Sequence, residues 1–101
     1  WPVASFRFLP PAEAELLQQI SYYSAIRPEL GIRFEEAVAN AVRSAAAFPK
    51  HGAPRSKNTR RRLVAGFPFG GIYKELEDEI LVVAVADGRR KPDYWAERID
   101  G

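Results

Sequence analysis

The sequence predicts an α+β fold in which an N-terminal helical hairpin packs on a small antiparallel β-sheet, in the order β-α-α-β-β-β. Two neighbouring segments with apolar residues at helical spacing predict the hairpin, and the shorter apolar or alternating segments after them predict the strands. Turn residues separate those strands at short intervals, which favours an antiparallel meander with the helix pair on one face. The 101 residues fit one small unit, so we expect a single domain over residues 1–101.

Prolines mark the boundaries of the first elements. Residues 3–9 alternate and their even-numbered members are apolar, which predicts a first strand with one buried face. The first helix is expected over about Pro11–Ile26, because proline suits a first helical turn and apolar residues then recur at helical spacing. Pro28 marks the start of the second helix and Pro49 marks its end. The apolar stripe between them consists of Leu30, Phe34, Val38, Val42, Ala45 and Phe48.

The second half of the chain predicts three strands. After a polar loop at Lys50–Asn58, we expect strands at Thr59–Gly66, Gly71–Leu76 and Ile80–Ala86. The last of these is apolar and rich in β-branched residues, which is typical of a central strand covered at least partly on both faces. The first strand then pairs either at an edge of the sheet or in its middle. A tail at Pro92–Ile99 follows, in which we expect one short helical turn.

Basic residues are segregated along the chain, although the formal net charge is only +2. No acidic residue occurs between Glu36 and Glu75, and acidic residues gather just after that stretch. Such segregation produces a positive field that attracts an anionic partner, either a nucleic acid or an acidic peptide. The basic residues in question are Arg43, Lys50, Arg55, Lys57, Arg60, Arg61, Arg62 and Lys74, followed by a second cluster of Arg89, Arg90 and Lys91.

Several classes of protein are disfavoured by composition. The sequence has no cysteine, no cluster with metal-ligand spacing, no phosphate-binding glycine loop and no nucleophile triad, so we expect neither a metal nor another cofactor. The longest apolar run, Ile80–Ala86, is far shorter than the roughly 18 residues of a membrane span. No signal-peptide pattern is visible. Because the sequence starts at Trp1 rather than Met, the presence of a leader before it stays an open question. We therefore expect a cytoplasmic protein that does not contact a membrane.

Four pieces of sequence, taken in order and at their spacing, resemble the RelE/ParE superfamily of bacterial toxins. The resemblance covers Leu9–Pro49 and Arg60–Ile99, and it implies the same hairpin-on-sheet fold. It also implies a partner, a cognate antitoxin that silences the toxin in a hetero-oligomer. The pieces are Tyr22–Tyr23, then Pro28–Gly31 with Phe34, then Phe67–Phe69 with Ile72–Tyr73, and finally Arg89–Trp95.

Two activities occur in that superfamily, and the residues favour one of them. RelE-like members cleave messenger RNA on the ribosome and carry a third-strand arginine, whose matching position here is Gly70, or Gly71 in a shifted register. Their closing tyrosine has no clean match, although Tyr94 lies near, and Arg90 corresponds roughly to a cationic position. The resemblance therefore implies a ParE-like toxin that inhibits DNA gyrase by binding rather than by catalysis.

Two alternatives remain open beside gyrase inhibition. One is a ribosome-dependent endoribonuclease with a rearranged site. The other is an inactive module that only binds its antitoxin. The candidate residues of the rearranged ribonuclease site are Arg61, Arg90, Lys91 and Tyr94.

The candidate binding residues fall into two sets. For the target, the closing segment supplies Arg89, Arg90, Pro92, Tyr94, Trp95 and Arg98. For the antitoxin, the stretch Ala37–Lys74 supplies Arg60, Arg61, Arg62 and Lys74. Alternation along a strand places Arg61 on the face opposite to that of its two neighbours. The alternative interpretation of this arginine run is an edge strand protected by charge.

The aromatic candidates and the single histidine also have structural interpretations. Tyr94 and Trp95 are expected to anchor the tail on the sheet, because aromatic side chains contribute much of the buried area in small cores. Tyr22 and Tyr23 are expected to pack within the core or the hairpin. His51 is expected to be a solvated loop residue rather than a catalytic base.

Overall fold

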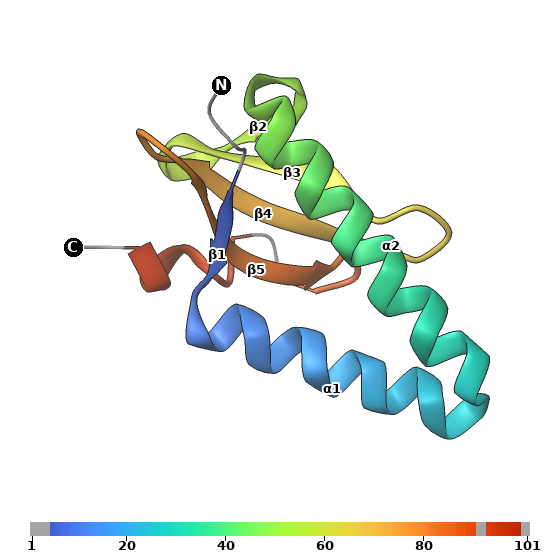
Figure 1. Cartoon of the computed structure of the whole chain (residues 1–101). Coiled ribbons are helices and arrows are strands. Elements are labelled where there is room, and N and C mark those ends of the chain that lie inside the picture. The colour runs from blue at the N-terminus through green and yellow to red at the C-terminus, as the bar shows by residue number, and fades with distance from the viewer. Residues whose placement is uncertain (1–4, 91–92, 100–101) are drawn as a thin grey trace.

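Two helices and a five-stranded sheet make up the fold (Figure 1). The computed structural model describes residues 5–90 and 93–99. The helices are α1 (Pro10–Ile26) and α2 (Pro28–Ala47). The strands are β1 (Phe6–Phe8), β2 (Ala53–Arg55), β3 (Thr59–Leu63), β4 (Phe69–Glu75) and β5 (Ile80–Asp87). Short 3₁₀ turns occur at Pro49–His51, Ser56–Asn58 and Ala96–Ile99.

The helical hairpin forms as the prolines predict. Arg27 has an extended backbone (φ −156°, ψ 137°) between the two helices, because the residue before a proline is disfavoured in the helical region. At the hairpin the helices approach closely. A Cβ atom added at Gly31 would lie only 1.8 Å from the hydroxyl oxygen of Ser24, so only glycine fits there. The hairpin is confirmed, with α1 beginning one residue earlier than expected.

The sheet has the order β1-β5-β4-β3-β2, and β2 to β5 form an antiparallel meander. The predicted fold class is confirmed. In addition, β1 pairs in parallel with β5 at one edge of the sheet. The helical hairpin then carries the chain to the opposite edge, where β2 lies. The strand β2 was not expected, since it is a three-residue, fully exposed edge strand within a polar segment. The prediction of a buried face on β1 is wrong at Phe6, which is 41% exposed, whereas Phe8 packs against the core.

The sheet separates two apolar clusters. On the helix side, α2 and the sheet bury a large cluster that includes Phe34, Val38, Tyr73 and Val82. Figure 1 shows α2 crossing the sheet on this side. On the opposite side, a smaller cluster forms around Trp95. β5 is buried along most of its length, as expected for a central strand, because it contributes residues to both clusters. Among the described residues, no helix is long and apolar enough to cross a membrane.

Candidate functional site

The three consecutive arginines of β3 face opposite sides of the sheet. Arg62 donates a hydrogen bond to the hydroxyl of Ser44 on α2, so it lies on the helix side. Arg60 donates to the backbone oxygens of Lys50 (3.1 Å) and Gly52 (2.9 Å). Arg61 lies on the other face, where it lines a cavity that has no helix over it. The alternation of the strand therefore divides these cations between different environments.

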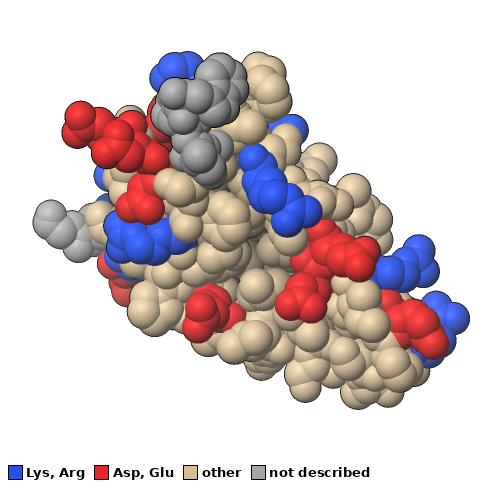
Figure 2. Space-filling view, viewed as in Figure 1, with Lys and Arg blue, Asp and Glu red and all other residues tan. Residues whose placement is uncertain are grey.

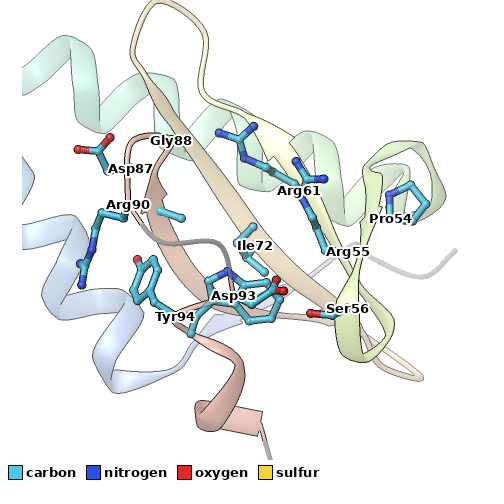
Figure 3. Close-up of a pocket in the computed structure, with 12 residues that line it drawn as sticks. Pro54, Arg55, Ser56, Arg61, Ile72, Asp87, Gly88, Arg90, Asp93 and Tyr94 are labelled. Atoms are coloured by element: carbon cyan, nitrogen blue, oxygen red, sulfur yellow. The ribbon is translucent and has the colours of Figure 1, made fainter.

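A cavity of about 700 Å³ occupies the face of the sheet opposite the helices (Figure 3). Its apolar residues are Ile72, Ala86 and Trp95, which belong to the smaller core cluster. Figure 3 shows Arg55 and Arg61 along one side, on β2 and β3, and Arg90 across from them. Its remaining charged or aromatic residues are Asp87, Asp93 and Tyr94. The cavity therefore combines an apolar floor with guanidinium groups from three segments of the chain.

Arg61 occupies the space that the missing side chain of Gly70 leaves open. A Cβ atom at Gly70 would lie 2.3 Å from Nε of Arg61, and one at Gly88 would lie 3.5 Å from its terminal nitrogen. The side chain thus passes from β3 over β4 toward the turn after β5. Gly70 was expected to leave this part of the sheet without a cation, and the structure places the guanidinium of the neighbouring strand there instead.

Glu15 of α1 fixes the C-terminal segment against the sheet. Its carboxylate accepts hydrogen bonds from the hydroxyl of Tyr94 (2.5 Å), from Arg98 (2.8 and 3.0 Å) and from the backbone N–H of Val85 (3.1 Å). Arg98 also donates to the backbone oxygen of Val83 at 3.0 Å. One carboxylate therefore joins α1, β5 and the tail.

Tyr94 is held in its protonated form by this arrangement. Burial is the main cause that raises the pKa of its phenol, and the hydrogen bond to Glu15 raises that pKa further. Arg90 stacks on the ring, with its guanidinium carbon 3.9 Å from the ring centroid, and lies 3.7 Å from Glu15. The tyrosine therefore positions Arg90 and keeps its proton at neutral pH.

Asp87 is engaged by the first arginine of the following turn. Arg89 donates two side-chain hydrogen bonds to its carboxylate, at 2.9 and 3.1 Å, and one backbone hydrogen bond at 2.9 Å. These hydrogen bonds, first that of the side chain and then that of the backbone, lower the pKa of Asp87. The carboxylate is therefore ionised and paired at neutral pH, and neither Asp87 nor Tyr94 is poised to exchange a proton there.

The expected site residues fall into four groups. Arg61, Arg90, Tyr94 and Trp95 line the one cavity. Arg60, Arg62 and Lys74 lie outside it, and Arg98 is turned inward toward Glu15. Arg89 is exposed beside the cavity. Lys91 and Pro92 lie outside the described residues.

The expectations for the aromatic residues and His51 hold, with one exception. Trp95 is 3% exposed within the smaller core cluster, so its role as an anchor is confirmed. Tyr23 packs against Phe34, whereas Tyr22 is 59% exposed and its expected core position is wrong. His51 is exposed, as expected, although it stacks on the Phe48 ring with a centroid distance of 5.1 Å.

A second hollow, of about 530 Å³, lies on the helix side between α2 and the β3–β4 turn. Small residues of α2, including Ala37 and Ala41, form one wall, and Leu63, which is 68% exposed, forms part of the other. Arg33 and Arg62 also line it. This groove offers apolar surface bordered by two arginines and by Glu36.

The segregation of charge along the sequence does not make the side of the molecule seen in Figure 2 uniformly basic. In the orientation of Figure 1, acidic and basic side chains are interspersed on the surface (Figure 2). Ion pairs explain part of this mixing, since Glu79 lies 3.1 Å from Arg7 and Glu75 lies 3.1 Å from Lys50. The acidic turn after β4 therefore balances basic residues that are distant in the sequence.

Three cavity or network residues were not identified from the sequence. The sequence marked Glu15 only as an acidic residue near the start of a helix. Its role in the network could not be predicted, because its partners Val85 and Arg98 lie 70 and 83 residues away in the sequence. Arg55 was one member of a long basic run, and Asp93 carried no signal. In the part of the chain that the structure describes, no group of three or more potential ligands is placed to hold a metal ion.

The fold and this cavity define a small α+β protein whose charged surface is suited to binding a partner. The model of the family described as the ParE toxin of the type II toxin–antitoxin system parDE matches residues 6–92. The chain therefore belongs to the ParE toxin family, which confirms the ParE branch of the resemblance.

A solved structure supports the same fold. A chain of the chromosomal ParDE TA system from P. aeruginosa superposes with a TM-score of 0.72 at 18% sequence identity. The match covers 84% of the present chain and 96% of that chain. No curated protein matches the sequence significantly.

Proposed function

We propose that this ParE-family toxin inhibits DNA gyrase in the cytoplasm by stoichiometric binding and that a cognate antitoxin neutralises it. The observation that carries the proposal is the family match over residues 6–92. The state of the cavity agrees with binding rather than catalysis, because the Tyr94 phenol stays protonated and Asp87 stays paired at neutral pH. Efficient proton transfer needs a group whose pKa lies near the working pH.

The proposed gyrase contact is the turn after β5 and the segment that follows it. Arg89 and Arg90 have side chains that are 78% and 56% exposed, so they are available to a partner. Trp95 and Arg98 serve this surface indirectly, because they anchor the segment through the smaller core and through Glu15. Truncation of the tail would therefore disrupt the fold as well as the contact, and point substitutions test the contact better.

The proposed antitoxin contact is the groove beside α2. Its small and apolar residues suit the apolar face of an amphipathic helix, and Arg33 and Arg62 suit acidic residues at the margin of such a helix. Of the expected antitoxin residues, Arg62 lines this groove, whereas Arg61 faces the other side of the sheet. The proposed complex is a hetero-oligomer of toxin and antitoxin.

A supercoiling assay tests the gyrase contact directly. We expect the Arg89→Gln/Arg90→Gln variant to need about tenfold more toxin for half-inhibition, because exposed charges at an interface steer association and orient partners. The matched control is Arg27→Gln/Arg43→Gln, which removes the same charge from exposed positions of the helical hairpin. Equal losses in both variants, or wild-type inhibition by the first, would contradict the contact.

One observation supports a second candidate function. Arg61, Arg90 and Tyr94, the described residues of the rearranged ribonuclease site, line the same cavity. A ribosome-programmed mRNA cleavage assay run beside the supercoiling assay separates the two functions. Cut mRNA with unaffected gyrase would establish the ribonuclease. A chain that affects neither reaction would be the inactive antitoxin-binding module.

A further inference from the structure

Arg61 differs from its two neighbours on β3 in having no internal partner. Arg60 and Arg62 donate hydrogen bonds to backbone or hydroxyl oxygens. Among residues 5–90 and 93–99, Arg61 forms neither a hydrogen bond nor an ion pair, although its side chain is partly buried in the cavity. Removing a charge from water without pairing it is unfavourable, so an anion that enters the cavity would gain a strong interaction here.

We propose that the sheet-face cavity binds a phosphodiester of a single-stranded nucleic acid. Arg61 and Arg55 hold the phosphate, and the apolar floor of Ile72, Ala86 and Trp95 receives the adjoining sugar or base. This site goes beyond gyrase inhibition and does not depend on it. Binding without cleavage is expected, because neither Tyr94 nor Asp87 is poised to transfer a proton at neutral pH.

The charges of the cavity favour a phosphate on one particular side. Figure 3 shows Arg61 and Arg55 on the same side of the cavity. Asp87 is occupied by Arg89, so it does not cancel the charge of Arg61. A planar guanidinium offers paired N–H donors that match two phosphate oxygens. The phosphate is therefore placed at Arg61 and Arg55.

The shape and the floor of the cavity favour a single strand over a duplex. Its volume of about 700 Å³ suits a group of nucleotide size rather than a double helix. Arg90, whose guanidinium carbon lies 3.9 Å from the centroid of the Tyr94 ring, adds a guanidinium group of the kind on which bases stack.

Fluorescence anisotropy with a labelled single-stranded oligonucleotide of about ten residues tests the site. We expect Arg61→Gln to weaken binding by about tenfold and to reduce the salt dependence by about one ion. The matched control is Arg43→Gln, which removes the same charge from an exposed residue on α2 that bonds to Asn40. We expect Arg43→Gln to bind almost as the wild type does.

A second variant displaces Arg61 without changing the charge. In Gly70→Ala, the new methyl group would lie 2.3 Å from Nε of Arg61, so the flexible arginine must turn away. We expect a several-fold loss of affinity with an unchanged melting temperature, so that folding and binding effects separate. The proposal is overturned if Arg61→Gln and Arg43→Gln lose affinity equally, or if duplex DNA or polyglutamate competes as well as the single strand.

Discussion

The two faces of the sheet differ in how they are covered. On one face, the hairpin buries a continuous apolar cluster in which Phe34 is fully buried. On the other, a short tail covers only the region around Trp95, and a cavity with charged walls remains open. Arg62 and Arg61, adjacent on β3, belong to one face each.

This difference separates stability from binding. Burial of apolar area is the main favourable contribution to folding, and the helix face supplies most of it. The cavity face contributes less apolar area and contains a cation without a partner among the described residues, an arrangement that suits the recognition of a ligand. Substitutions on the first face should therefore lower stability, and those on the second should change binding.

Phe34→Ala should show the largest effect on stability. The Phe34 ring lies 5.1 Å from the rings of Tyr23 and Phe67 and 5.3 Å from that of Phe69, so truncation would open a cavity among packed aromatics. We expect the free energy of unfolding to fall by about 3–5 kcal/mol, measured by urea denaturation. The control is Ile32→Ala on the same helix, because Ile32 is 57% exposed. Similar losses for both variants would show that the helix face is not the main core.

Glu15→Gln should have the next largest effect, where α1 meets the C-terminal tail. The substitution removes the carboxylate that Arg98 and Tyr94 share, and we expect a loss of about 1–3 kcal/mol in unfolding free energy. A double-mutant cycle with Arg98→Gln should show coupling, because the two side chains are in direct contact. Glu13→Gln, an exposed acid two residues away, is the control. Additive losses in the cycle would mean that the network does not hold the tail.

The helix face is also the part of the fold that the sequence predicts best. Apolar periodicity and the prolines at 10, 11 and 28 define the hairpin within one residue. The apolar run of β5 indicates a strand covered on both sides, as it is. Two features were not predictable, namely the parallel pairing of β1 with β5 and the presence of the short strand β2. Both depend on the position of the chain before and after the helical hairpin, and not on any local pattern.

The cavity face was only partly predictable. Alternation along β3 was enough to place Arg61 opposite its neighbours. The absence of a side chain at Gly70 was visible, but the passage of Arg61 into that space depends on strand register. The role of Glu15 had no local signal, since it requires contact with residues at the far end of the chain.

Tyr94→Phe should cause a smaller, pH-dependent loss. The folded chain raises the pKa of the Tyr94 phenol, so its contribution is fully present below the unfolded value of about 10 and is lost as the pH rises through the folded value. At neutral pH we expect a loss of about 0.5–1.5 kcal/mol from the missing hydrogen bond to Glu15. Denaturation at neutral pH and above pH ~10 should show the difference between variant and wild type shrinking. A difference that is constant with pH would mean that Tyr94 titrates normally.

The adjacent pair Arg61 and Arg62 gives the smallest and sharpest test of the two faces. Arg62→Gln should lower the unfolding free energy by about 0.5–1.5 kcal/mol, because it weakens the contact of β3 with Ser44 on α2. Arg61→Gln removes an equal charge from the same strand but breaks no pair within residues 5–90 and 93–99, so we expect a change within about 0.5 kcal/mol. Urea denaturation at one salt concentration measures both. If Arg61→Gln proves the more destabilising of the two, the cavity face stabilises the fold. Arg61 would then have a structural role rather than a role in ligand binding.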